Sequence, residues 1–138
     1  LPTDVLCGKN IHDTNPVNCK IHEMSPEEMI LDIGENSTEF INNKIINSKM
    51  VLWNGPVGAF EFQPYDKATN AIANVIKVHA KKLNINTLAG GGDTVSAIKN
   101  TNAEDGFNYI SNAGGAFLEW LEGKESPGVK SLKENSLT

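Results

Sequence analysis

The chain has 138 residues, of which 39% are hydrophobic and 21% are charged, as is typical of one soluble globular domain. Its 12 basic residues are all lysines and its 17 acidic residues outnumber them, so the net charge of −5 argues against a nucleic-acid groove. No apolar run has the length of a membrane span, and no signal peptide is visible. The chain begins at Leu1 without a methionine, so we expect a piece of a longer protein.

The N-terminal third contains two apolar runs and one helical segment. Residues 4–7 and 29–33 are rich in strand formers and predict strands. The polar stretch between them contains two prolines and predicts a loop with room for one edge strand. Asn36 and Glu39 have the spacing of a capping pair, which predicts a helix over residues 36–48.

From Met50 onward, a pattern of strand, turn and helix repeats. The predicted strands cover residues 50–53, 84–89 and 107–111, and the predicted helices cover residues 67–83, 94–100 and 116–122. Gly123 stands where a helix C-terminus favours glycine.

This alternation predicts an α/β fold: a parallel sheet with helices on both faces, in a Rossmann-like three-layer arrangement. The strands that end at glycine are expected to lie side by side in that one sheet. We expect it to contain Leu31, Leu52, Leu88 and Tyr109.

The two cysteines are most simply interpreted as reduced thiols of a cytoplasmic protein, because their spacing matches no disulfide framework. A zinc site is the alternative, since four candidate ligands fall close together in the sequence. These ligands are Cys7, His12, Cys19 and His22, but their uneven alternation differs from the paired spacing of structural zinc sites.

Two glycine turns are candidate anion sites. Residues 90–92 are three consecutive glycines followed by Asp93 and Thr94, and the turn at 112–115 also leads into a helix. Glycine lets a phosphate approach the backbone, and a helix N-terminus offers free N–H groups. The simpler alternative is a pair of tight turns with Asp93 as a helix cap. A carboxylate beside a phosphate repels it unless a cation bridges them, so Asp93 is a candidate magnesium ligand, and Thr94 offers an N–H and a hydroxyl.

The loop over residues 53–61 is a third candidate for ligand binding. Asn54 can donate to a phosphate oxygen, and Glu61 can accept from sugar hydroxyls, although a solvated loop charge is the simpler interpretation of Glu61. Neither the Walker A pattern nor the dinucleotide-binding pattern G-x-G-x-x-G is present.

Taken together, these segments resemble the phosphoglycerate kinase family, in a bacterial-type form, over nearly the whole chain. The matching segments are residues 1–5, 31–34, 53–61, 90–94, 111–119 and 121–124. The resemblance implies a two-lobed protein, of which residues 1–123 form part of the C-terminal, nucleotide-binding lobe without its first strands. Residues 124–138 would be a tail that returns toward the N-terminal lobe.

The family's reaction is phosphoryl transfer between 1,3-bisphosphoglycerate and ADP, giving 3-phosphoglycerate and ATP in cytoplasmic glycolysis. The resemblance therefore implies a carboxyl-directed phosphotransferase that uses Mg²⁺ and ATP/ADP and acts as a monomer, with no nucleic-acid or membrane partner. It implies that Glu61 contacts the ribose and that Asn54 and Pro56 line the nucleotide cleft. It also implies phosphate contacts from Gly91, Gly92, Asp93 (toward the magnesium) and Thr94, and catalytic backbone groups at Gly114 and Gly115.

The chain departs from the usual family pattern at four positions. Ile30 stands where a glycine is common near the base pocket, and Asn112 and Ala113 replace a common Thr-Gly pair. Ser126 stands where an apolar residue is common before the proline. The backbone donors of the turns are the same with either set of residues.

The sequence also predicts an incomplete catalytic site. Phosphoryl transfer requires positive charge near the migrating group, yet the chain has no arginine and its glycine turns contain no lysine. We therefore expect the chain alone to be inactive as a kinase. The alternatives are a non-catalytic nucleotide- or anion-binding module and an inert structural fragment. Binding of magnesium-ADP would distinguish the inert fragment from the other two, and turnover would distinguish the kinase from the binding module.

Overall fold

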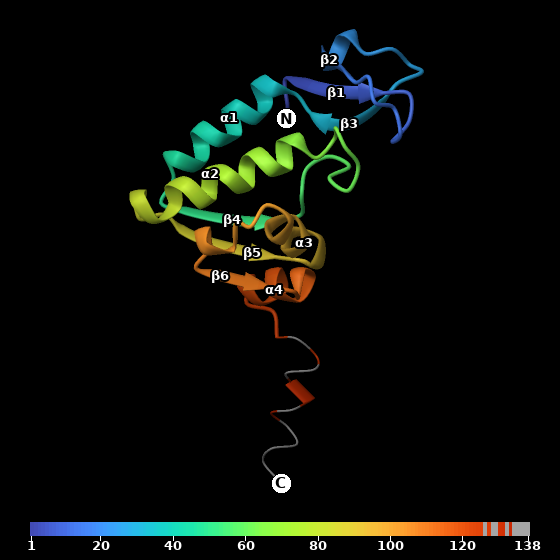
Figure 1. The fold of residues 1–138 in the computed structure, drawn as a ribbon. Coiled ribbons are helices and arrows are strands. Elements are labelled where there is room, and N and C mark those ends of the chain that lie inside the picture. Colours follow the sequence, from blue (N-terminus) through green and yellow to red (C-terminus); the bar gives the residue numbers. More distant parts are fainter. Residues whose placement is uncertain (126, 128–129, 132, 134–138) are drawn as a thin grey trace.

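The computed structural model describes residues 1–125, 127, 130, 131 and 133, without the side chains of Phe117 and Trp120. It contains two separate three-stranded sheets joined through a pair of long helices (Figure 1). The expected return of the tail over 124–138, with Ser126, falls largely outside the described residues.

The N-terminal sheet is antiparallel, with the order β2-β1-β3. Its strands are β1 (Asp4–Gly8), β2 (Val17–Lys20) and β3 (Met29–Ile33). The strands predicted over residues 4–7 and 29–33 are confirmed as β1 and β3. The polar stretch between them contains β2, which is the edge strand that the sequence allowed there. The prediction that Leu31 lies in the parallel sheet is wrong, because β3 pairs antiparallel with β1. An apolar run indicates a strand but carries no information about its partner.

The second sheet is parallel and has the order β4-β5-β6, which confirms the predicted α/β class. Its strands are β4 (Met50–Asn54), β5 (Asn86–Gly90) and β6 (Tyr109–Ser111). As predicted, Leu52 is in register with Leu88, which is in turn in register with Tyr109.

In the described part of the chain, the sheets are accompanied by the α-helices α1 (Glu35–Ile46), α2 (Lys67–Leu83), α3 (Gly92–Asn100) and α4 (Gly114–Leu121), and by the short 3₁₀ helices η1 (Ile21–Glu23) and η2 (Glu104–Gly106). Figure 1 shows α1 and α2 packed side by side, while α2, α3 and α4 all contact the central strand β5. No helix in the described part of the chain is long and apolar enough to cross a membrane.

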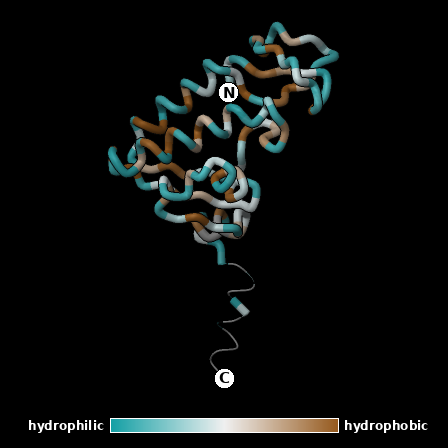
Figure 2. The backbone as a smooth tube through the Cα atoms, viewed as in Figure 1, coloured by the Kyte–Doolittle hydropathy of each residue, from teal (hydrophilic) through white to brown (hydrophobic). Residues whose placement is uncertain are grey.

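The hydrophobic core lies between α1, α2 and the parallel sheet, where Figure 2 shows brown segments facing one another. Helix α2 contributes buried residues at a spacing of four, as its sequence pattern predicts. These are Ala68, Ile72, Ile76 and Ala80. The last three of these residues pack in one cluster with Trp53 of β4 and Ile98 of α3.

The start of α1 differs from the sequence-based expectation. Its N-cap is Gly34, and neither Asn36 nor Glu39 caps the helix through its side chain. Instead, the Asp4 carboxylate accepts hydrogen bonds from the backbone N–H groups of Asn36 (3.0 Å) and Ser37 (2.8 Å). The predicted capping pair is therefore wrong, because a carboxylate distant in the sequence already occupies these donors.

Candidate functional site

The C-terminal ends of the parallel strands meet at one edge of the sheet. Asn54, the last residue of β4, is in register with Gly90, and Gly90 is in register with Ser111. The turns that follow these three strands therefore emerge side by side. Ligands of parallel α/β sheets bind beyond this edge.

The two glycine turns touch each other directly. Gly91 has a φ of +102°, which only glycine adopts readily, and its N–H donates to the carbonyl of Ser111 at 3.0 Å. A Cβ added to Gly114 would lie 2.7 Å from the Cα of Gly91, closer than such atoms approach. Glycine at both positions thus allows the turns before α3 and α4 to form one continuous surface.

Asn54 lies against both turns. Its Oδ1 would be 3.1 Å from a Cβ on Gly91 and 3.0 Å from a Cβ on Gly114, although the residue as a whole is exposed. The amide group therefore stands at the junction of the two turns, within reach of any anion held there.

Thr94 connects the helix α3 to the turn after β4. Its hydroxyl oxygen is fully buried and accepts a hydrogen bond from the N–H of Gly55 at 2.7 Å. The carbonyl of Gly55 in turn accepts from the indole Nε1 of Trp53 at 2.7 Å. Thr94 therefore holds the turn that contains Pro56 in place.

Two helix N-termini open onto this surface. Helix α3 begins at Gly92 and α4 begins at Gly114, and the first N–H groups of a helix have no partner within it. A Cβ added to Gly92 or to Gly115 would meet nothing within 4 Å, so there is open space in front of both positions. Free donors, positive dipole ends and open space are the requirements of an anion site.

Asp93 is exposed in the first turn of α3, and its carboxylate forms no hydrogen bond or ion pair with the rest of the described chain. Its carboxylate is thus available to a ligand. Magnesium typically uses one or two carboxylates together with substrate phosphates and water, so a single free carboxylate beside an anion site fits this ion.

The loop between β4 and α2 is fixed at two points, neither of which the sequence indicated. The Ala59 N–H donates to the carbonyl of Leu31 at 2.7 Å. The Thr69 hydroxyl accepts from the Val57 N–H at 3.0 Å and donates to the Val57 carbonyl. Glu61 projects from this anchored loop, exposed and without a hydrogen bond or ion pair to any described residue.

Asp32 is a further polar residue whose role the sequence reasoning missed. It is 2% exposed, and its carboxylate accepts from the N–H groups of Ile33 (2.8 Å) and Ala68 (3.1 Å) at the start of α2. Burial raises the pKa of Asp32 to about 6, against the opposing effect of these two bonds. A charged residue inside the apolar run 29–33 was the available signal, since such a residue needs buried partners.

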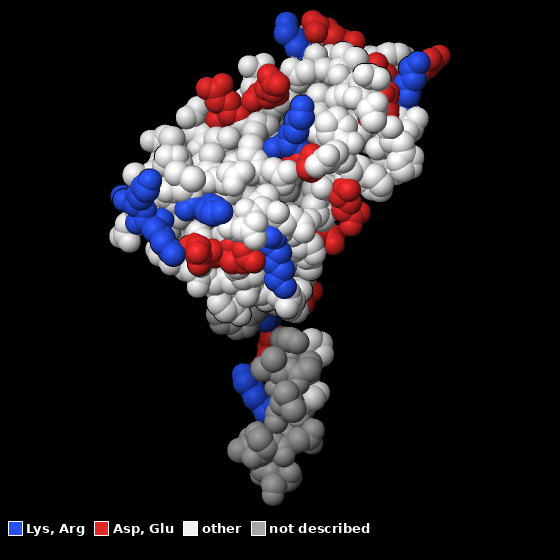
Figure 3. Space-filling view, viewed as in Figure 1, with Lys and Arg blue, Asp and Glu red and all other residues white. Residues whose placement is uncertain are grey.

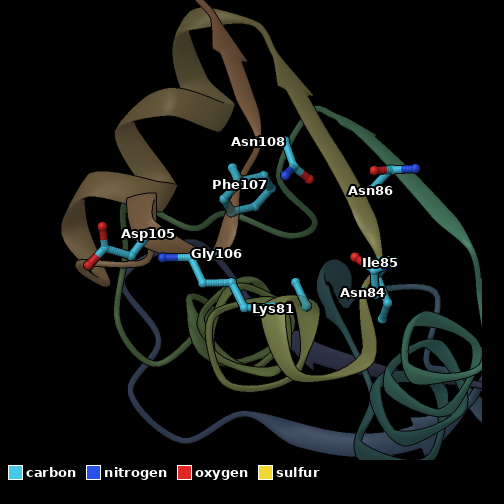
Figure 4. Close-up of a pocket in the computed structure, with 9 residues that line it drawn as sticks. Lys81, Asn84, Ile85, Asn86, Asp105, Gly106, Phe107 and Asn108 are labelled. Atoms are coloured by element: carbon cyan, nitrogen blue, oxygen red, sulfur yellow. The ribbon is translucent and has the colours of Figure 1, made fainter.

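The opposite edge of the sheet has a different character. A cavity of about 180 Å³ lies between the end of α2 and the beginnings of β5 and β6. Figure 4 draws the residues that line it. Its labelled lining residues include Lys81, Asn86, Asp105 and Asn108. In Figure 3, lysines gather over the C-terminal end of α2, where Lys81 and Lys82 lie in the last turn. The basic side chains of this region are thus remote from the glycine turns.

The alternative of a zinc site is wrong for the described residues, among which no three His, Cys, Asp or Glu side chains gather around a possible metal. Cys7 and Cys19 are adjacent free thiols. His12 packs edge-on against Phe62, with ring centroids 5.6 Å apart, and His22 is exposed beside a glutamate.

Comparison with known proteins identifies the same family as the sequence motifs. The sequence model described as phosphoglycerate kinase matches residues 1–124. The phosphoglycerate kinases of Novosphingobium aromaticivorans and Rhodospirillum centenum are 44% identical over 135 residues and 47% identical over 133 residues. Each comparison covers 96% of this chain.

The fold agrees with these relatives. The solved structure of phosphoglycerate kinase from Coxiella burnetii superposes with a TM-score of 0.85 at 33% identity, over 98% of this chain. The chain spans 34% of the length of that structure and of both curated relatives. By sequence and by fold, this chain belongs to the phosphoglycerate kinase family.

Proposed function

We propose that this chain is the nucleotide-binding part of a phosphoglycerate kinase, which moves a phosphoryl group between 1,3-bisphosphoglycerate and ADP to give 3-phosphoglycerate and ATP. Residues 1–123 form the partial C-terminal lobe in this proposal, and residues 124–138 form a tail directed toward an N-terminal lobe. The whole protein acts as a cytoplasmic monomer.

The contact between Gly91 and Gly114 is the observation that carries the proposal. It brings the N-termini of α3 and α4 to the same point, so that their free N–H groups converge on one anion. Gly91 and Gly92 surround the nucleotide phosphates, and the Thr94 N–H donates to them. Gly114 and Gly115 face the phosphoryl group that is transferred, where converging N–H donors stabilise its charge.

The remaining site residues orient the nucleotide. The Asn54 amide donates to a phosphate oxygen at the junction of the turns, and Pro56 lines the cleft on the turn that Thr94 holds. Glu61 accepts hydrogen bonds from the ribose hydroxyls. Asp93 holds Mg²⁺, which when bound neutralises phosphate charge during transfer.

Binding of magnesium-ADP to the protein, measured by titration calorimetry, tests the nucleotide role. Asp93→Asn should weaken binding in the presence of magnesium much more than in its absence. Asp105→Asn is the matched control, because Asp105 is also an exposed aspartate near a helix start but lies at the opposite edge of the sheet. Equal effects of magnesium on both variants would contradict the role of Asp93.

Catalysis requires a second experiment. The chain has no arginine, and positioned arginines contribute about 10³–10⁵ in rate to phosphoryl transfer, so the 138-residue chain alone should show no turnover. In a full-length enzyme, Asp93→Asn should remove several kcal/mol of transition-state stabilisation, a rate loss of about a hundredfold or more. The rate of ATP formation from 1,3-bisphosphoglycerate and ADP measures the turnover of the 138-residue chain and the loss caused by Asp93→Asn.

The second candidate, a non-catalytic nucleotide-binding module, is favoured by the lack of any cationic side chain in the glycine turns. It predicts the same binding of magnesium-ADP but no ATP formation by the full-length protein. Turnover by that protein would exclude it.

A further inference from the structure

Cys7 and Cys19 form a thiol pair across two neighbouring strands. β1 pairs antiparallel with β2, with Cys7 opposite Val17 and Val5 opposite Cys19, so the two cysteines are diagonal neighbours on one face. Their Sγ atoms are 3.4 Å apart. Both are free thiols, Cys7 fully buried and Cys19 half-buried.

The surroundings allow these sulfur atoms to approach further. A disulfide bond is about 2.05 Å long, so the atoms must move roughly 1.3 Å closer. β2 is an edge strand with hydrogen bonds to β1 on one side only, and three of its four residues are exposed. It can therefore shift toward Cys7 without disturbing the core.

We propose that Cys7 and Cys19 are a redox-active pair that closes to a reversible disulfide and thereby clamps the β1–β2 hairpin. Hydrogen peroxide is the oxidant. Cys19 reacts first because it is the accessible thiol: its sulfur is oxidised to a sulfenic acid and one water leaves. The Cys7 sulfur then attacks the Cys19 sulfur, forming the S–S bond and releasing a second water, so that two thiols and one peroxide give one disulfide and two waters.

The order of these steps follows from the environment of Cys7. Burial, the hydrogen bond with Cys19, and the nearby Cys19 and Glu28 charges raise the pKa of Cys7 to about 12. Cys7 is thus a poor first nucleophile at neutral pH but is already in place to attack an oxidised Cys19. The closing step is expected to be the slower of the two.

The disulfide would also affect the loop that precedes α2, because the β1–β2 hairpin packs against it. The hairpin loop between β1 and β2 contacts the loop that precedes α2: the Tyr65 hydroxyl donates to the carbonyl of Asp13 at 2.7 Å, and His12 packs against Phe62. A disulfide would close the hairpin loop into a covalent ring and restrict its motion. Residues 62–65 should then become more rigid. This inference goes beyond the proposed function and does not depend on it.

Intact-mass measurement of the full chain after treatment with hydrogen peroxide tests bond formation. We expect the loss of two hydrogens, a peptide linking Cys7 to Cys19, and full reversal by dithiothreitol. Cys19→Ser and Cys7→Ala should each prevent the mass loss, and the former is the safer variant because Cys19 is not in the core. Sulfinic acid at Cys19 with a free Cys7, or disulfides between two chains, would overturn the proposal.

Hydrogen exchange tests the clamp. In the oxidised protein, the backbone amides of residues 9–15 and of Phe62, Gln63 and Tyr65 should exchange several-fold more slowly than in the reduced protein. Cys19→Ser treated in the same way should show no such change. Unchanged exchange at both segments in a protein that carries the disulfide would overturn the clamping role.

Discussion

The Asp4 carboxylate forms two hydrogen bonds with Ser37, one from the backbone N–H at 2.8 Å and one from the hydroxyl. This contact attaches the start of α1 to β1 and so fixes the helix against the antiparallel sheet. Burial opposes ionisation of Asp4, but the bonds from Ser37, Asn36 and Asn18 outweigh it and lower the pKa of Asp4 below its ordinary value of 3.8.

Asp4→Asn should lower the free energy of unfolding by about 1–3 kcal/mol at pH 7, because charge-assisted bonds to the helix start are lost. The folded-state pKa is lowered, so the stability that the Asp4 carboxylate contributes is present above pH 3.8 and is lost as the pH falls through the folded-state value. Urea unfolding of the wild type and the variant, at pH 7 and at a pH below the folded-state pKa of Asp4, measures this difference in stability. Asp105→Asn is the control, and an equal loss there would contradict the specific role of Asp4.

Asp32→Asn should raise the free energy of unfolding relative to the wild type at neutral pH, whereas Asp4→Asn should lower it. The folded-state pKa of Asp32 is raised to about 6, so its folded state holds the proton more tightly than its unfolded state, and wild-type stability falls as the pH rises from about 4 to 6. The amide has no charge to desolvate, so the variant should gain up to about 3 kcal/mol relative to the wild type between pH 4 and pH 7. A stability difference that is constant over this range would contradict the buried-charge interpretation.

Gly114→Ala and Gly115→Ala form a matched pair. The first places a methyl group 2.7 Å from the Gly91 Cα and should cost about 1–3 kcal/mol, with the two turns forced apart. The second places it in open space at the start of the same helix and should leave stability within about 0.5 kcal/mol. Thermal unfolding of the two variants measures this difference. Similar melting temperatures would show that the fold does not need the close contact between Gly91 and Gly114.

Thr94→Val should lower stability by about 1 kcal/mol, because the Gly55 N–H loses the buried Thr94 hydroxyl as its acceptor. Thr94→Ser keeps the hydroxyl and should restore most of this loss. Urea unfolding of both variants measures the difference. If serine destabilises as much as valine, the methyl packing of Thr94 matters more than its hydrogen bond.

The sequence by itself determined the local elements around the candidate site. The spacing of apolar residues predicted α2, and the short apolar runs that end in glycine predicted β4, β5 and β6. Gly123, with a φ of +80°, follows the end of α4 as its position predicted. These features depend on neighbours in the chain, because helix periodicity, turn chemistry and the conformational freedom of glycine are local properties.

Only the tertiary structure decided how these elements combine. It placed β3 beside β1, because strand pairing depends on distant partners that an apolar run does not specify. It supplied the cap of α1 from Asp4, since a carboxylate fixed by another strand can satisfy the same N–H groups as a local cap. The contact between Gly91 and Gly114 has the same origin: each turn is visible in the sequence, but their meeting requires two adjacent parallel strands to end at one edge.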